Sequence, residues 1–278
     1  SQPCDPNIHG LISDKCIQVN TTDLCVVYTE LPDGIKFSVR SCIKETKASD
    51  LAMYLAKGIG SGGGHIEKAG GFISWKKYKE LCPDFHTEAF FSERIQEYCN
   101  SFDIIEAKTY DIDTSDMLSY RKKKLPVGYA IPTDILPLGT PITIRTLEGD
   151  IDTVISDDSY IMVGIQGEVY VNSKEKFAYS YRITEEPYHP DTVYSPTVKN
   201  RLTGKMIPLE KFMHSCIPTG EIYIKARPLT KAVKIFTQWD EEKYLLGNIG
   251  DYIAVRSDDA HDIYVIAASI FKKTYEEI

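Results

Sequence analysis

Gly60-Ser61-Gly62-Gly63-Gly64-His65-Ile66-Glu67-Lys68-Ala69-Gly70-Gly71 is the stretch of this sequence that says most about its fold. Three consecutive glycines, Gly62–Gly64, leave backbone N–H groups unshielded by Cβ atoms and allow positive φ angles. A short helix that begins near His65 would direct its free N–H groups and the positive end of its dipole at the same place. This combination is typical of a phosphate site, and His65 can donate a hydrogen bond to a phosphate oxygen. For a glycine run alone, a tight turn without a ligand is the simpler interpretation.

The residues on both sides of this stretch predict a mixture of strands and helices. β-branched and aromatic runs between turn residues predict strands, and an apolar face that ends in glycine predicts a helix. We expect strands at Cys16–Val19, Leu24–Thr29, Ile35–Val39 and Gly71–Ser74, and helices at Ala48–Gly58, Ser74–Leu81 and Thr87–Asn100. Together they predict an α/β domain with trailing helices over residues 1–106.

Two motifs resemble the DHHA1 domain of DHH-family phosphoesterases. Gly62-Gly63-Gly64-His65, followed by Ala69-Gly70, resembles its GGGH signature, and Phe37-Ser38-Val39-Arg40-Ser41 resembles its upstream S-x-R-S element. The resemblance covers about residues 10–75 and implies a mixed-sheet α/β fold. It also implies that Arg40, Ser38, Gly62, Gly63, Gly64 and His65 bind a substrate phosphate. Lys68 stands where the family has alanine, and it either adds a phosphate contact or faces water.

In that family, a separate N-terminal DHH domain holds two divalent metals, usually manganese, and carries out hydrolysis. No Asp-His-His occurs here, so we expect that domain to be missing and this chain to be inactive alone, without catalytic residues, metal or cofactor of its own. The resemblance implies a small phosphate-bearing ligand or short oligonucleotide as substrate, and the DHH domain as partner. Two alternatives stay open, a non-catalytic nucleotide- or RNA-binding module and a protein-interaction protein.

The C-terminal part contains an internal repeat of strand-forming sequence. Thr146, Tyr160, Tyr170, Phe177 and Tyr181 recur as Thr237, Tyr252, Tyr264, Phe271 and Tyr275, at offsets of 91 to 94 residues. These ordered matches predict two related all-β modules, at residues 107–200 and 201–278, with a link near Pro187–Pro208. The whole chain is therefore expected to be α+β. The modules resemble small domains, with a Gly-Asp-Tyr string such as Gly250-Asp251-Tyr252, that follow DHHA1 in some bacterial phosphoesterase-like proteins.

Charge and cysteine content limit the classes of function. The net charge of −8 argues against a broad nucleic-acid-coating surface, although a phosphate pocket needs only a few donors. No apolar run is long enough for a membrane helix, so we expect no membrane partner. The seven cysteines are scattered, without C-x-x-C, which favours free thiols in a reducing, cytoplasmic compartment. The acidic string Asp258-Asp259-Ala260-His261-Asp262 is interpreted as a polar hairpin loop.

Overall fold

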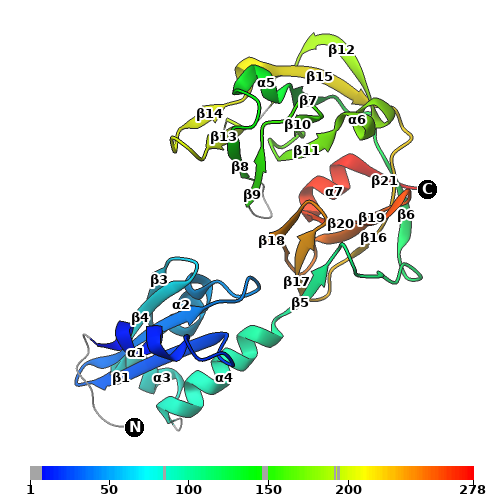
Figure 1. Ribbon diagram of the computed structural model, residues 1–278. Helices are drawn as coiled ribbons and strands as arrows, with labels where there is room; N and C mark the ends of the chain where they lie inside the picture. The colour runs from blue at the N-terminus through cyan, green and yellow to red at the C-terminus, as the bar shows by residue number, and fades with distance from the viewer. Residues whose placement is uncertain (1–7, 84–85, 146–149, 191, 193–194) are drawn as a thin grey trace. The chain divides into compact units, whose positions relative to one another are not determined.

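The protein consists of two compact units, Ser1–Phe102 and Asp103–Ile278, which we call the N-terminal unit and the C-terminal unit. Figure 1 shows the computed structural model, which describes residues 8–83, 86–145, 150–190, 192 and 195–278. Both units combine sheets with short helices, so the chain is α+β, as the sequence predicts.

The N-terminal unit is built on a four-stranded sheet with the order β1-β2-β4-β3, in which all neighbours are antiparallel. Its strands are β1 (Leu24–Leu31), β2 (Gly34–Ser41), β3 (Gly60–Gly64) and β4 (Lys68–Ser74). The prediction of a mixed sheet is therefore wrong. A helix joins β2 to β3 and lets them run in the same direction, but β4 lies between them, so no parallel pair forms.

Helices α2 (Ala48–Ala56), α3 (Trp75–Leu81) and α4 (Thr87–Asn100) supply the apolar residues that cover one face of this sheet. Phe37 of β2 is fully buried in the same core as Leu51 and Leu55 of α2. Its ring also meets the ring of Phe91 on α4, with 5.7 Å between centroids. The structure confirms the three predicted helices: α2 and α4 each bury several apolar residues, and α3 buries Tyr78.

The strand predicted at Cys16–Val19 is wrong. Helix α1 (His9–Cys16) ends where this strand was expected to begin, and turns follow it; the helix contacts β1 and β2. The ring of His9 is hydrogen-bonded to the hydroxyl of Thr29 on β1, and the Ser13 hydroxyl donates to the His9 carbonyl. A four-residue run with three apolar side chains is too short to distinguish a strand from the end of a helix and the turns that follow it.

The C-terminal unit contains two modules, each made of two sheets. The sheets of the first module have the orders β11-β10-β7-β15-β12 and β14-β13-β8-β9, and those of the second have β20-β19-β16-β6-β21 and β18-β17-β5. In the first module the elements are β7 (Val127–Ala130), α5 (Pro132–Ile135), β8 (Pro141–Arg145), β9 (Asp150–Val154), β10 (Ser159–Val163), β11 (Val169–Ser173), α6 (Lys174–Ser180), β12 (Tyr181–Pro187), β13 (Thr197–Asn200), β14 (Met206–Pro208), η1 (Glu210–Phe212) and β15 (Met213–Pro218). In the second module they are β5 (Phe102–Glu106), β6 (Leu118–Lys122), β16 (Tyr223–Pro228), β17 (Ala232–Thr237), β18 (Asp240–Gly247), β19 (Tyr252–Arg256), β20 (Asp259–Ile266), α7 (Ala268–Thr274) and β21 (Tyr275–Glu277). Because each module also carries a short helix, neither is all-β.

The order of elements is the same in both copies of the repeat. From β8 to β12 the first copy reads strand, strand, strand, strand, helix, strand, and β17 to β21 repeats that order. The rings of Phe177 and Tyr181 stack at 5.3 Å and 23°, and those of Phe271 and Tyr275 at 5.3 Å and 19°. The repeated aromatic residues therefore have the same packing role in both modules. Thr146 lies outside the described residues.

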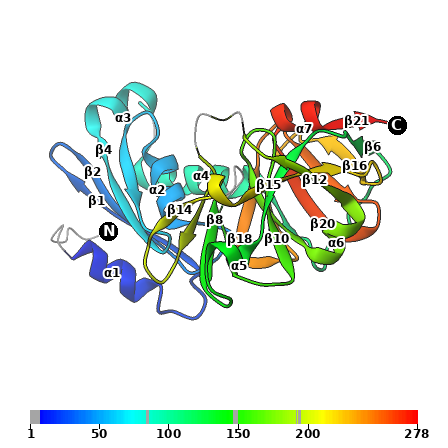
Figure 2. The same cartoon turned by 90° about the horizontal axis from the view of Figure 1, so that it is seen from above.

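The modules are not divided at residue 200 as the sequence predicts, because the two repeats exchange strands. β5 and β6, which precede the first module in the chain, complete the sheets of the second module. β13 and β15, their counterparts in the second repeat, complete the sheets of the first. The registers agree, since Tyr181 of β12 pairs with Pro218 of β15 and Tyr275 of β21 pairs with Lys122 of β6. Figure 1 labels all four of these strands beside the sheets that they complete, and Figure 2 shows β6 with β16 and β21.

Candidate functional site

Arg40 and Ser38 lie on the same face of β2, opposite the apolar core. Alternate residues of a strand point to opposite faces, and Ile35, Phe37 and Val39 point into the core. Ser38 is in register with Gly70 of β4, and Gly70 is in register with Gly63 of β3. The S-x-R-S element and the glycine run are therefore parts of one sheet, with β4 between them.

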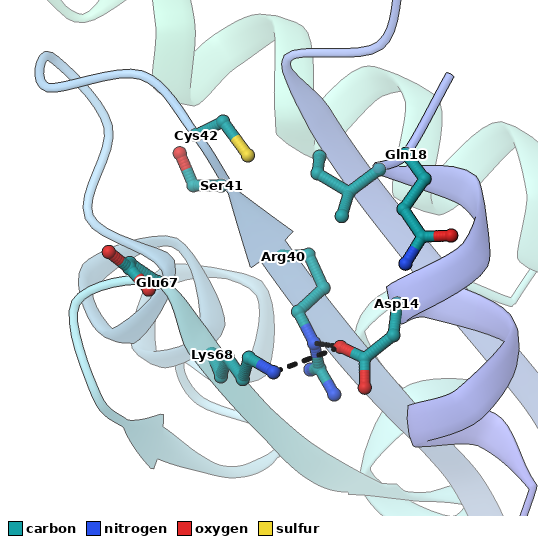
Figure 3. A pocket seen from close by; sticks show the side chains of 8 residues that line it. Asp14, Gln18, Arg40, Ser41, Cys42, Glu67 and Lys68 are labelled. Carbon is teal, nitrogen blue, oxygen red and sulfur yellow. Dashed lines mark hydrogen bonds and ion pairs between the residues drawn. The ribbon is translucent and has the colours of Figure 1, made fainter.

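Arg40 makes its main contact with a carboxylate that the sequence analysis did not consider. Nε of Arg40 donates to Oδ1 of Asp14 on α1 at 2.7 Å, and its Nη1 donates to the carbonyl of Val39 at 3.0 Å. Nζ of Lys68 lies 3.3 Å from the same Oδ1. Figure 3 shows both cationic side chains directed at the Asp14 carboxylate. They converge because Arg40 and Lys68 are register partners on β2 and β4.

A cavity of about 520 Å³ adjoins this ion-pair cluster. Its walls come from the end of α1, the end of β2 and the beginning of β4, and its polar residues are Asp14, Gln18, Arg40, Ser41, Glu67 and Lys68. The Arg40 side chain is 11% exposed and that of Lys68 is 59% exposed. Arg40 is thus held in place by its surroundings, whereas the Lys68 side chain is mostly exposed and reaches Asp14 with its ammonium group.

The charge of Asp14 is stabilised by these two cations. The hydrogen bond from Arg40 lowers the pKa of the Asp14 carboxyl below its ordinary value, and Lys68 lowers this pKa further. The carboxylate is therefore ionised at neutral pH. Since its pKa is depressed in the folded protein, the contact contributes at neutral pH and is lost as the pH falls through the lowered pKa.

The glycine run forms an edge strand, and no helix follows it. His65 N donates to the carbonyl of Lys68 at 2.8 Å, which closes a hairpin between β3 and β4. The expected helix dipole at His65 is therefore wrong, because antiparallel pairing with β4 takes the chain back along the sheet. In an antiparallel sheet, the N–H and C=O groups of successive residues point alternately to the two sides of the strand. Those of Gly63 therefore point to β4, and those of Gly62 and Gly64 point to the open edge of the sheet.

Different glycines of the run meet different surroundings. A Cβ atom on Gly62 would lie 2.1 Å from the backbone oxygen of Ala52 on α2, and Gly64 has a φ angle of +149°. Close helix packing and backbone conformation thus account for these two glycines without a ligand. A Cβ atom on Gly63, by contrast, would meet no atom within 4 Å. Gly63 is therefore the glycine of this run beside which a ligand has room to approach.

The predicted site residues do not all line one cavity. Arg40 lines the cavity, but neither His65 nor Gly62–Gly64 is among the described residues that line it. His65 is exposed at the hairpin. The two residues that the sequence analysis missed or left undecided, Asp14 and Lys68, are the ones that contact or adjoin Arg40. Asp14 carries no sequence signal, because it lies in a helix that was not predicted.

The acidic string near the C-terminus has a structural role. Asp259–Asp262 belong to β20, so only its beginning lies in the connection from β19. Nζ of Lys176 on α6 lies 3.3 Å from Asp259 and 2.9 Å from Asp262. The ion pairs join the first module to the second.

Comparisons with protein-family models, with curated proteins and with solved structures found no match to this chain. In the described part of the chain, no helix is long and apolar enough to cross a membrane. Within the same residues, no three histidine, cysteine or acidic side chains gather in a way that could hold a metal ion. What the site binds must therefore be argued from its own residues.

Proposed function

We propose that the N-terminal unit binds a phosphate group of a nucleotide or short oligonucleotide, as the substrate-binding part of a DHH-type phosphoesterase that is inactive without its catalytic domain. One observation carries the proposal. Arg40 Nε and Lys68 Nζ converge on a single anionic oxygen, Oδ1 of Asp14, at the edge of a cavity. A phosphate oxygen has the charge and acceptor character of that carboxylate oxygen, so it can take the same position.

Arginine suits this role better than lysine would. Its planar guanidinium can hold a phosphate through two parallel hydrogen bonds, and the hydrogen bond from its Nη1 to the carbonyl of Val39 does not depend on Asp14. Ser41 lies next to it in the cavity wall, and its hydroxyl donates to the carbonyl of Ile43. The cavity is open and the ligand must displace Asp14, so we expect weak binding, with a Kd in the millimolar range, about −4 kcal/mol.

Replacing Arg40 should weaken the binding of adenosine 5′-monophosphate. We expect Arg40→Ala to raise the Kd about tenfold, because a charge-assisted hydrogen bond contributes roughly 1.5–3 kcal/mol. Arg40→Lys keeps the positive charge but loses the paired N–H donors of the guanidinium. Its Kd should lie between those of Arg40→Ala and the unchanged protein. Titration followed by NMR, at constant ionic strength, measures the Kd.

Arg182→Ala is the matched control, because it removes the same charge from an exposed strand position. Its Kd should stay within twofold of that of the unchanged protein. Equal Kd values for Arg40→Ala and Arg182→Ala, with both variants folded, would contradict the proposed function.

Replacing Asp14 should have the opposite effect. In Asp14→Asn the competing negative charge is gone, and Arg40 and Lys68 become available to the ligand. We expect the affinity for adenosine 5′-monophosphate at pH 7 to rise about tenfold, which corresponds to about 1.4 kcal/mol. Asp23→Asn removes the same charge at an exposed position before β1 and should leave the affinity unchanged. An affinity that falls in Asp14→Asn would mean that Asp14 supports the ligand instead of competing with it.

A further inference from the structure

The C-terminal unit has a second cationic cavity, independent of Arg40. It has a volume of about 310 Å³ and lies on the outer face of the sheet β14-β13-β8-β9. The inner face of this sheet carries Ile142, Ile144 and Val198, which are fully buried. Because strand residues alternate between faces, Thr143, Arg145 and Lys199 point outward.

The strand register brings the polar side chains of this face into rows. Lys199 of β13 pairs with Thr143 of β8, and Thr143 pairs with Asp152 of β9. Two residues further along β8, Arg145 pairs with Asp150. The polar surface therefore extends over three neighbouring strands, which is about 10 Å at the usual strand spacing.

The other module adds a cation to the same cavity. Nζ of Lys243, on β18, lies 2.7 Å from Oδ2 of Asp152, and Nη1 of Arg201 lies 3.5 Å from that oxygen. Nε of Arg145 lies 3.2 Å from Oδ1 of Asp150. The described lining thus contains four cationic side chains, Arg145, Lys199, Arg201 and Lys243, and two carboxylates.

Lys199 is the cation that these carboxylates do not neutralise. No ion pair or hydrogen bond of its ammonium group is present among the described residues, and its side chain is exposed. Asp152 is occupied by Lys243, Arg201 and the hydroxyl of Thr143, which donates to its Oδ1 at 2.6 Å. The face therefore keeps an excess of positive charge in a chain whose net charge is −8. Such a local excess attracts anions even to an acidic protein.

We propose that this cavity, the C-terminal cation site, binds a ligand that carries two or more phosphate groups. The cations come from β8, from β13 and the turn that follows it, and from β18. Lys243 and Arg201 converge on one oxygen of Asp152, whereas Arg145 contacts Asp150, two residues and about 7 Å further along β9, so the cations offer two separate anion positions. Arginine supplies paired hydrogen bonds and lysine a point charge, which is the usual combination for phosphate recognition. The shared chemistry fits an inorganic polyphosphate or the backbone of a short oligonucleotide.

Binding should be measured with the full chain carrying Arg40→Ala, so that the N-terminal unit contributes little. One arm uses tripolyphosphate by calorimetry, and the other uses a fluorescein-labelled oligoribonucleotide of about eight nucleotides by anisotropy. We expect the Arg40→Ala chain to bind at least one probe, with an affinity that falls as salt rises. Binding of tripolyphosphate alone identifies a small polyphosphate, and binding of the oligoribonucleotide identifies a nucleic-acid backbone. No saturable binding of either probe at 1 mM protein overturns the proposal.

Variants of the same chain locate the bound probe. Lys199→Glu should lower its affinity at least tenfold, whereas Lys211→Glu, with the same charge change at an exposed position of η1, should lower it less than twofold. Arg145→Gln serves as a second variant if Lys199→Glu fails to fold by circular dichroism, and it should lower the affinity at least threefold. Equal affinities for the Lys199 and Lys211 variants, or for Arg145→Gln and the parent chain, overturn the proposal. Since Arg40 is replaced throughout, neither result depends on the phosphate site of the N-terminal unit.

Discussion

A fragment of residues 123–221 should fold in isolation, whereas a fragment of residues 223–278 should not. The first fragment contains every strand of the first module, from β7 to β15. The second contains β16 to β21 but lacks β5 and β6. β6 lies between β16 and β21 in its sheet, so its loss removes an interior strand and leaves two unpaired edges.

The missing segment with β5 and β6 also carries core residues. Tyr120 of β6 packs against Phe271, with ring centroids 4.8 Å apart, and Met117 and Ile105 belong to the buried core of the second module. A module of this size has little stability to spare, so we expect complete loss of the folded state.

Circular dichroism and NMR spectra distinguish the outcomes. The control joins residues 102–122 through a glycine-serine linker to residue 278 of the unfolded fragment. This places β5 and β6 after β21, where β13 and β15 follow β12 in the first module, and it should restore a dispersed spectrum. A dispersed spectrum from residues 223–278 alone would contradict the strand exchange.

The repeat was predictable, but the exchange was not. The spacing of Tyr170, Phe177 and Tyr181 and of their counterparts reports the order of local elements. It carries no information on which copy of a strand completes which sheet, because β6 and β15 suit equivalent positions. The predicted division at residue 200 therefore separates the two sequence repeats, whereas the observed modules are defined by which strands pair with each other.

At the candidate site, too, the sequence predicted local elements but not the contacts between residues that are far apart in the chain. Helices α2 and α4 were predicted close to their observed bounds, since their apolar faces are local signals. The contact between Arg40 and Asp14 joins residues 26 positions apart. It depends on α1, which was not predicted and which overlaps the strand expected at Cys16–Val19 only at Cys16. The glycine run was recognised, but its physical role differs from one residue to the next.

Gly62→Ala and Gly63→Ala should differ strongly in stability, although they make the same change at adjacent positions. At Gly62 the new methyl group would lie 2.1 Å from the backbone oxygen of Ala52. Carbon and oxygen atoms do not approach so closely, so α2 must move away from β3 and open the core around Leu51 and Leu55. We expect Gly62→Ala to lower the free energy of unfolding by about 3 kcal/mol.

At Gly63 the methyl group has space, and the backbone has no positive φ angle. Gly63→Ala should therefore change the free energy of unfolding by less than about 1 kcal/mol. Urea denaturation of both variants, followed by circular dichroism, measures the difference. Equal destabilisation would mean that α2 does not pack on β3 as closely as the structure describes.

The stable Gly63→Ala variant then tests whether a ligand uses the open face of β3. Its new methyl group projects from the row that contains Ser38 and Gly70, on the side of the sheet that carries Arg40. If the phosphate-bearing ligand extends from Arg40 across this row, the methyl group should raise the Kd for adenosine 5′-monophosphate several-fold while the protein stays folded. An unchanged Kd would confine the ligand to the cavity between α1 and Arg40, and the glycine run would then serve only the close packing of β3 against α2.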